Sequence, residues 1–329
     1  MVDDPWKDLA TPLSIDKLNA RRVDATLPWN FFWAKGVDRQ CLLILRHMAT
    51  STPKSKIPRL KDIEIRVTSE ADGTRIVAFT LLDSAHRDVF YRLCRDIVAA
   101  ASEARTEKEA VEVFIARTWR WHHLLRGGDD RLSPEEQKGV IGELLVLERV
   151  FLHCLSPAEA ISLWRGPLGA PKDFCIGRVC VEVKARREDA KPFVVISNEH
   201  QLDESGVDKL FLYVVALDQG SSVTAGSFTL PEVVDRVRNK ISGIDPSSVG
   251  AYEGLLEATG FRREDDYSDF RWVEGKDILY HVKAGFPCIT PIGMATGISD
   301  VKYSLSLVVC SPFLVSERAL LDALKTGAM

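Results

Sequence analysis

Three residues of this chain, Asp173, Glu182 and Lys184, have side-chain types and a spacing that could form a cation-binding site. From residue 179 to residue 184, valine alternates with cysteine, glutamate and lysine. Successive side chains of a strand point to opposite faces, so this pattern predicts a strand that carries Glu182 and Lys184 on one face. Two acids and an ammonium at one strand edge suit a bound cation, because a cation relieves the repulsion between neighbouring carboxylates.

A tight turn at Gly177 is expected to bring Asp173 beside Glu182. Glycine accepts the positive φ that such a turn needs, and Ile176 and Arg178 flank it. We therefore predict a hairpin whose first strand starts near Asp173 and whose second strand is the alternating one.

A helix over residues 133–152 is predicted to contribute a further acid, Glu143. The Ser-Pro-Glu-Glu sequence at 133–136 is a strong helix start, with a serine cap, a proline in the first turn and a capping-box glutamate. Glu143 adjoins the apolar stripe of this helix, where an unpaired carboxylate is unfavourable. The structural alternative to a functional role is therefore an ion pair with Arg149 or Arg165.

The elements that must position these residues follow one another as helix, three strands, a short helical turn, a strand and a helix. Their predicted ranges are 133–152, 172–176, 179–185, 193–197, 199–204, 210–216 and 231–241. Helical and strand periodicities thus alternate along this part of the chain. The predicted fold class is α/β, with an αβββαβ core.

A chain of 329 residues is long enough for more than one domain. Residues 1–105 are predicted to form a β-rich domain with a following helix, because an Asp-Gly turn separates two apolar runs there. Residues 106–245 would form the core, and residues 246–329 an α+β extension packed on it. Further helices are predicted at 88–101, 107–125, 249–259 and 315–324.

The αβββαβ order and its acids resemble the PD-(D/E)xK nuclease superfamily, and among its members a bacterial group whose proteins look like parts of restriction or phage-defence loci. The residues that carry the resemblance are Gly142, Glu143, Leu144, Asp173, Glu182 and Lys184. The match departs from the motif in one place, because Lys172 precedes the aspartate and Pro171 is displaced by one position. The resemblance implies a restriction-endonuclease-like fold and a metal-dependent DNA endonuclease.

The resemblance also implies roles for single residues. The catalytic set would be Asp173, Glu182, Lys184 and Glu143, and the metal ligands would be Asp173, Glu182, Glu143 and the carbonyl of Val183. Mg²⁺ suits such oxygen ligands, and Mn²⁺ is a substitute. Lys184 would lie beside the attacking water and stabilise developing negative charge.

Four further residues are candidates for contacts to DNA phosphates or for support of Lys184: Ser197, Gln201, Arg178 and Arg186. Together with Arg187 and Lys191, the two arginines would give the hairpin a local positive patch. Two alternatives stay open. Ser197 could cap a helix instead, and the patch could be a solvated charged turn.

Composition limits the functions that fit this chain. A net charge of −4 and a pI of about 6.0 argue against a polycation that coats DNA through charge alone. The seven cysteines include no Cys-x-x-Cys pair, which argues against a disulfide framework and a structural zinc site and favours reduced core residues. No apolar run is long enough to span a membrane, so a cytoplasmic protein is the default expectation.

Two classes of function remain open at this point. One is a DNA endonuclease that acts with partner proteins of a defence system or as a homodimer. The other is a nuclease-fold module for DNA binding or assembly that is inactive or needs a partner for cleavage. A further interpretation is an unrelated α/β scaffold with chance acids, which distant carboxylates would support.

Overall fold

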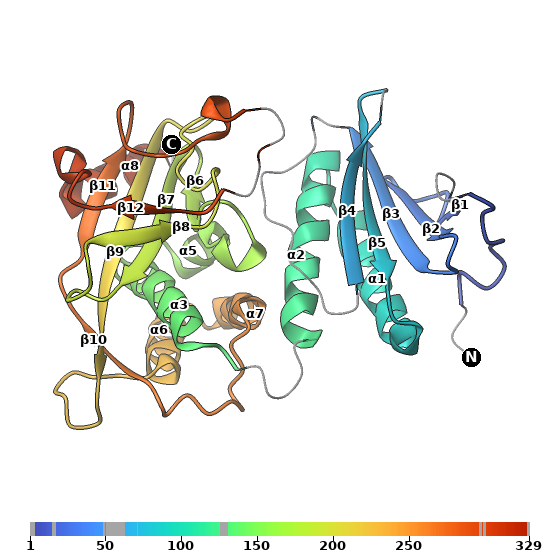
Figure 1. Cartoon of the computed structure of the whole chain (residues 1–329). Helices are drawn as coiled ribbons and strands as arrows, with labels where there is room; N and C mark the ends of the chain where they lie inside the picture. The colour runs from blue at the N-terminus through green and yellow to red at the C-terminus, as the bar shows by residue number, and fades with distance from the viewer. Residues whose placement is uncertain are drawn as a thin grey trace. The chain divides into compact units, whose positions relative to one another are not determined.

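The computed structural model describes residues 4–14, 18–48, 50, 63–70, 72–125, 131–295, 298 and 301–327 as a mixed α/β protein (Figure 1). The chain divides into two compact units, Met1–Asp129 and Asp130–Met329. The division lies beyond the predicted one between residues 105 and 106. The predicted core range 106–245 thus begins inside the first unit, and its start differs from the observed one.

The first unit contains a five-stranded antiparallel sheet in the order β1-β2-β3-β5-β4. Its elements are β1 Asn19–Arg22, β2 Asn30–Lys35, β3 Cys41–Met48, β4 Ile63–Ser69, β5 Thr74–Leu81, α1 Arg87–Ser102 and α2 Glu107–Leu125. Both helices share one hydrophobic core with the sheet. Phe114 of α2 meets Phe79 of β5 edge to face at 4.7 Å. The packing of α2 against the first sheet explains why the boundary lies after this helix.

The second unit contains a larger sheet in the order β10-β9-β7-β6, with β11 also paired to β9. The strands are β6 Phe174–Ile176, β7 Val179–Arg186, β9 Lys209–Gly220, β10 Arg271–Glu274 and β11 Ile278–Val282. β7 and β9 are parallel, and the other pairs are antiparallel. The helices are α3 Pro134–Val146, α4 Leu152–Cys154, α5 Pro157–Leu163, α6 Leu230–Ile244, α7 Val249–Thr259 and α8 Glu317–Gly327.

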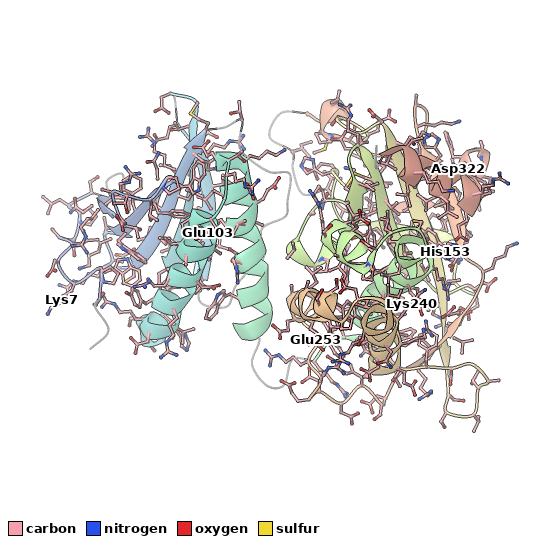
Figure 2. The ribbon with its side chains drawn as sticks, turned by 180° about the vertical axis from the view of Figure 1, so that it is seen from behind. Lys7, Glu103, His153, Lys240, Glu253 and Asp322 are labelled. Atoms are coloured by element: carbon pink, nitrogen blue, oxygen red, sulfur yellow. A yellow bond between two sulfur atoms is a disulfide. The ribbon has the colours of Figure 1, made fainter. Side chains whose placement is uncertain are left out.

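The capping box predicted for α3 is confirmed. Ser133 accepts from the Glu136 backbone N–H, and the Glu136 side chain accepts in return from that of Ser133. The helix continues through a π-helical turn, Leu147–Phe151. Lys240 of α6, labelled in Figure 2, donates to the carbonyl oxygen of Glu148 in this turn at 2.7 Å. This hydrogen bond connects α6 to the π-helical turn that continues α3.

β8 Phe193–Ile196 does not join the larger sheet of the second unit. It pairs instead with β12 Tyr303–Ser306 in a separate two-stranded sheet. The helical turn predicted at 199–204 is a series of non-helical turns. Gln201 accepts the Ser197 backbone N–H and Asn198 that of His200, so side chains compete there with helical hydrogen bonding.

The C-terminal segment is built into the second unit. β10 and β11 extend the larger sheet, and Leu320 and Leu324 of α8 lie in the same hydrophobic core as Val181 of β7. β12 supplies the partner strand for β8. Residues beyond 246 therefore complete the fold that holds the candidate site.

The two faces of β7 have different partners. The valines at 179, 181 and 183 belong to the core shared with α3, and Gly142 of α3 faces Val183 and Ala185. A Cβ at Gly142 would lie 3.2 Å from the Ala185 Cβ, so glycine permits this close approach. Glu182 and Lys184 alternate with the valines and project from the opposite face.

Candidate active site

The predicted hairpin is confirmed. Phe174 pairs with Val181 and Ile176 with Val179, so Gly177 and Arg178 form the turn. Gly177 has a φ of 53°, the positive value for which glycine was expected.

Asp173, which directly precedes β6, is hydrogen-bonded to β7. Its Oδ2 accepts the backbone N–H of Val183 at 2.7 Å. The aspartate is therefore positioned by a bond to the strand residue between Glu182 and Lys184.

Glu182 and Lys184 form an ion pair, with 2.5 Å between Oε1 and Nζ. Glu182 is fully buried, and its second oxygen, Oε2, has no hydrogen-bond partner among the residues that the structure describes. A buried carboxylate oxygen without a donor is unfavourable. The site therefore has an unsatisfied acceptor on the residue expected to bind a cation.

Glu143 of α3 reaches the same region. A Cβ built on Gly166 would lie 2.6 Å from Glu143 Oε2 and 2.7 Å from Asp173 Oδ1, so both oxygens border one point in space. Glu143 Oε2 accepts the indole N–H of Trp164 at 2.6 Å. Neither arginine considered from the sequence is the partner of Glu143. Arg149 pairs with Glu274 and Asp277 instead, and Arg165 is exposed.

The segment after α5 supports both carboxylates. The backbone N–H groups of Arg165 and Gly166 donate to the Asp173 carbonyl at 2.7 and 3.1 Å. The preceding residue, Trp164, supplies the indole that holds Glu143. One short segment thus contacts the acid from α3 and the acid from the hairpin.

Burial dominates the electrostatics of the acids. It raises the pKa of Glu182 to about 8, an effect that the Asp173 carboxylate increases and Lys184 opposes. Burial, followed by repulsion from Asp173, raises the pKa of Glu143 well above its ordinary value. Burial also raises the pKa of Asp173, against the Lys184 charge and the Val183 N–H.

Burial alone would lower the pKa of Lys184, but the charges of Glu182, Asp173 and Glu143 outweigh it and raise that pKa. Lys184 therefore stays an ammonium at neutral pH. The carboxyl groups of Glu182, Asp173 and Glu143 thus outnumber the Lys184 ammonium on which they act.

Among the residues that the structure describes, no group of three or more His, Cys, Asp and Glu side chains is arranged to hold a metal ion. Glu143 and Asp173 face one another at Gly166, whereas Glu182 Oε1 faces Lys184. The donor chemistry nevertheless fits a hard cation, because Asp173 Oδ1, Glu143 Oε2 and the unsatisfied Glu182 Oε2 are oxygen donors.

The residues considered for phosphate contact make bonds within the protein. Gln201 accepts the Ser197 backbone N–H at 2.7 Å, and Arg178 pairs with Asp208 at 2.7 Å. Arg186 donates to the carbonyl oxygen of Ala190 at 2.5 Å. Ser197 precedes no helix in this structure, so the alternative of helix capping does not apply.

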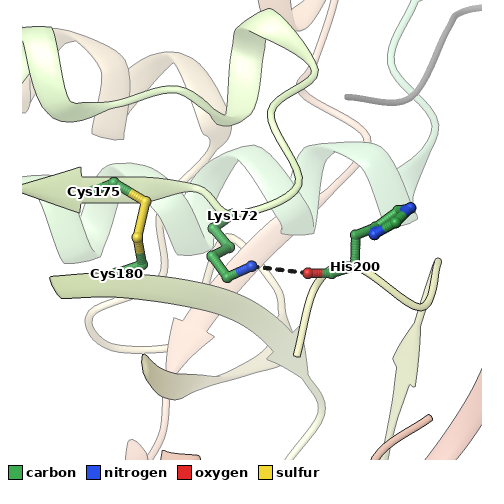
Figure 3. The surroundings of a disulfide bond; sticks show 4 residues. All are labelled: Lys172, Cys175, Cys180 and His200. Carbon is green, nitrogen blue, oxygen red and sulfur yellow. Dashed lines mark hydrogen bonds between the residues drawn. A yellow bond between two sulfur atoms is a disulfide. The ribbon is translucent and has the colours of Figure 1, made fainter. Parts of the chain in front are cut away.

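Cys175 and Cys180 form a disulfide across the hairpin, which corrects the expectation of reduced cysteines (Figure 3). They are directly opposite one another in the β6–β7 register, with Cα atoms 4.2 Å apart. The expectation fails for this pair, because a tight hairpin places residues five apart directly opposite one another, and it holds for the other five cysteines, which are free thiols.

In the sequence, Lys172 stands out only because it occupies the position before Asp173 where the motif has a proline. It is buried, and its Nζ donates to the His200 carbonyl at 2.9 Å, as Figure 3 shows. Its charge also lowers the pKa of Glu182. Trp164 and Gly166 were not considered from the sequence at all, since nothing in the spacing of either residue relates it to Glu143.

The comparisons with known proteins agree with this geometry at the level of the family. The family model described as "Putative PD-(D/E)XK family member, (DUF4420)" matches residues 2–308. No curated protein and no solved structure matches the chain. Within the described part of the chain, no helix has the length and apolar character needed to cross a bilayer.

Proposed function

Because the chain belongs to the PD-(D/E)XK family DUF4420, we propose that it is a metal-dependent DNA endonuclease acting in restriction or phage defence. The observation that supports the proposal is the convergence of Glu143 from α3 with Asp173, Glu182 and Lys184 from the β6–β7 hairpin. PD-(D/E)XK nucleases generally use a divalent metal, and Mg²⁺, with Mn²⁺ as a substitute, is the ion we propose.

The carboxylates of Asp173, Glu182 and Glu143, with the Val183 carbonyl, would hold the ion. When bound, it lowers the pKa of a coordinated water and polarises the scissile phosphate. Lys184 then orients the attacking water and stabilises charge that develops on the phosphate. The ion pair with Glu182 supports this role, because it holds the ammonium beside one of the proposed ligands.

Phosphate contacts are proposed for Ser197, Gln201, Arg178 and Arg186. For Gln201 and the two arginines they require the side chain to exchange an internal bond for a bond to DNA, whereas the internal bond of Ser197 is made by its backbone N–H. The Arg178 pair with Asp208 is exposed on both sides, so exchange is inexpensive there. Arg186 is held by backbone carbonyls and is the less available of the two arginines.

The proposal is tested with purified protein and plasmid DNA, alone and with proteins encoded at the same locus. Nicking or linearisation should require Mg²⁺ or Mn²⁺ and stop on chelation. Undiminished cleavage in EDTA would refute a metal-dependent mechanism. DNA binding without cleavage under every condition would favour the alternative, a nuclease-fold binding or assembly module.

Two variants separate the roles within the site. Lys184→Ala should reduce cleavage by roughly a hundredfold or more while metal affinity is kept, because lysine offers no ligand to the ion. Glu182→Ala should lose cleavage and metal affinity together. Titration calorimetry with Mn²⁺ provides the affinities. Wild-type cleavage by Lys184→Ala would show that the motif is assigned to the wrong residues.

A further inference from the structure

We infer that Trp164 and Gly166 are positioning residues that set the Glu143 and Asp173 carboxylates at the distance and orientation needed to bind a cation together. The hydrogen bond and the close approach are observations on this chain alone. The link to cation binding rests on the proposed function. The tests below therefore include a measurement that needs neither DNA nor cleavage.

Trp164 is held rigidly. Its side chain is 1% exposed and stacks on Tyr252 of α7, with ring centroids 6.3 Å apart. The Tyr252 hydroxyl donates to the carbonyl oxygen of Val234 in α6 at 3.1 Å. Trp164 therefore packs against α7, and α7 is hydrogen-bonded to α6.

The only donor of an indole is its N–H, and in Trp164 it points at the Glu143 carboxylate. Such a hydrogen bond has a preferred direction, because it weakens when donor, hydrogen and acceptor depart from a line. Because the ring is buried and stacked on Tyr252, the bond favours the Glu143 conformation that is seen in the structure. That conformation places Oε2 beside Gly166 and towards Asp173.

Gly166 keeps open the space that both carboxylates border. A Cβ there would approach Glu143 Oε2 and Asp173 Oδ1 to 2.6 and 2.7 Å, closer than real Cβ contacts. The φ of Gly166 is not among the positive values found in the chain, so the backbone does not require glycine at this position. The need for glycine therefore comes from the two acids.

Trp272 provides a matched control for Trp164. It is also buried in the second unit, 4% exposed, but its indole nitrogen has no hydrogen-bond partner within the described part of the chain. Phenylalanine at either position keeps an aromatic ring and removes the N–H. Both Trp164→Phe and Trp272→Phe lose buried indole volume, whereas only Trp164→Phe also loses the hydrogen bond to Glu143.

The first experiment measures Mn²⁺ affinity by titration calorimetry. Trp164→Phe should weaken binding roughly tenfold or more, and Trp272→Phe should leave it unchanged. In Glu143→Gln, adding Trp164→Phe should cause little further loss, because both changes act through one carboxylate. Equal effects in the two phenylalanine variants, or full additivity with Glu143→Gln, would show that Trp164 is only a core residue.

The second experiment follows the Trp164 indole N–H by ¹⁵N–¹H NMR without metal or DNA, assigned from the signal lost in Trp164→Phe. Glu143→Gln should shift this resonance, and the Trp272 resonance should stay in place. An unmoved Trp164 signal would overturn the inference. If the signal responds to Glu143→Gln but no divalent ion binds the wild type, the proposed function fails while the hydrogen bond stands.

Gly166→Ala tests the other half of the inference. The added methyl should force the carboxylates apart and weaken Mn²⁺ binding, with the melting temperature measured beside it. Gly139→Ala in α3, where a Cβ would meet nothing within 4 Å, is the control and should bind as the wild type does. Unchanged affinity in Gly166→Ala would show that the space beside this glycine has no role in cation binding.

Discussion

At the level of single residues, Glu182 lies in an environment that is unfavourable for an ionised acid. The side chain is fully buried, one oxygen faces Lys184, and the other has no donor. Asp173 lies close enough to raise its pKa further. An arrangement that disfavours the ionised acid in the metal-free protein is one that a cation can relieve.

This crowding predicts a pH-dependent stability. The pKa of Glu182 is about 8 in the folded protein, against an ordinary value of 4.5. Between these values the unfolded chain releases a proton that the folded chain keeps, so the free energy of unfolding should fall as pH rises through this interval. The fall from this residue is on the order of a few kcal/mol.

Denaturant unfolding in EDTA at pH values from about 5 to about 8 measures this effect. Glu182→Gln, which cannot ionise, should show a flatter dependence than the wild type, and Mg²⁺ should restore stability at the alkaline end. A slope that is the same in the wild type and in Glu182→Gln would contradict the assignment.

At the level of elements, the β6–β7 hairpin is held on two sides. The disulfide joins its strands one residue beyond Phe174. Phe174 stacks on Phe151 of the π-helical turn, with ring centroids 4.4 Å apart. The turn that ends α3 therefore packs against the residue next to Asp173, which couples the placement of Glu143 to that of the hairpin.

The disulfide should contribute to stability by restricting the unfolded chain. For the short loop between Cys175 and Cys180, chain-entropy reasoning gives about 2 kcal/mol. Reductant should therefore lower the melting temperature of the wild type. The variant with Cys175→Ser and Cys180→Ser should begin near that lower value and not respond to reductant. An equal response in both proteins would place the sensitive group elsewhere.

At the scale of the whole molecule, each unit has a hydrophobic core of its own. The candidate site is built entirely within the second unit, from α3, the segment after α5, and the hairpin. With a net charge of −4, the proposed contact with DNA would have to depend on local cations.

Two separate cores predict two unfolding transitions in scanning calorimetry. Mg²⁺ should raise the temperature of only one transition, that of the unit that holds the site, because a ligand stabilises the unit to which it binds. Glu182→Gln identifies this transition, since it should lose most of the shift. A shift of both transitions, or the same shift in Glu182→Gln, would mean that the ion binds at another place.

The local features of the fold were determined by the sequence alone. The capping box starts α3, and Gly177 turns the hairpin that brings Asp173 to the strand of Glu182 and Lys184. Helices predicted at 88–101 and 249–259 correspond to α1 and α7. Caps, tight turns and periodic patterns act between residues a few positions apart, so their effect can be read without knowledge of the fold.

The remaining features were decided by the tertiary structure. The pairing of β8 with β12, the packing of α2 in the first unit and the bond from Trp164 to Glu143 join residues that no local pattern relates. Gly166 is an ordinary loop glycine in the sequence, and its role depends on two carboxylates from other elements. Such contacts follow from how buried faces and polar groups are satisfied together, and only the folded chain specifies that combination.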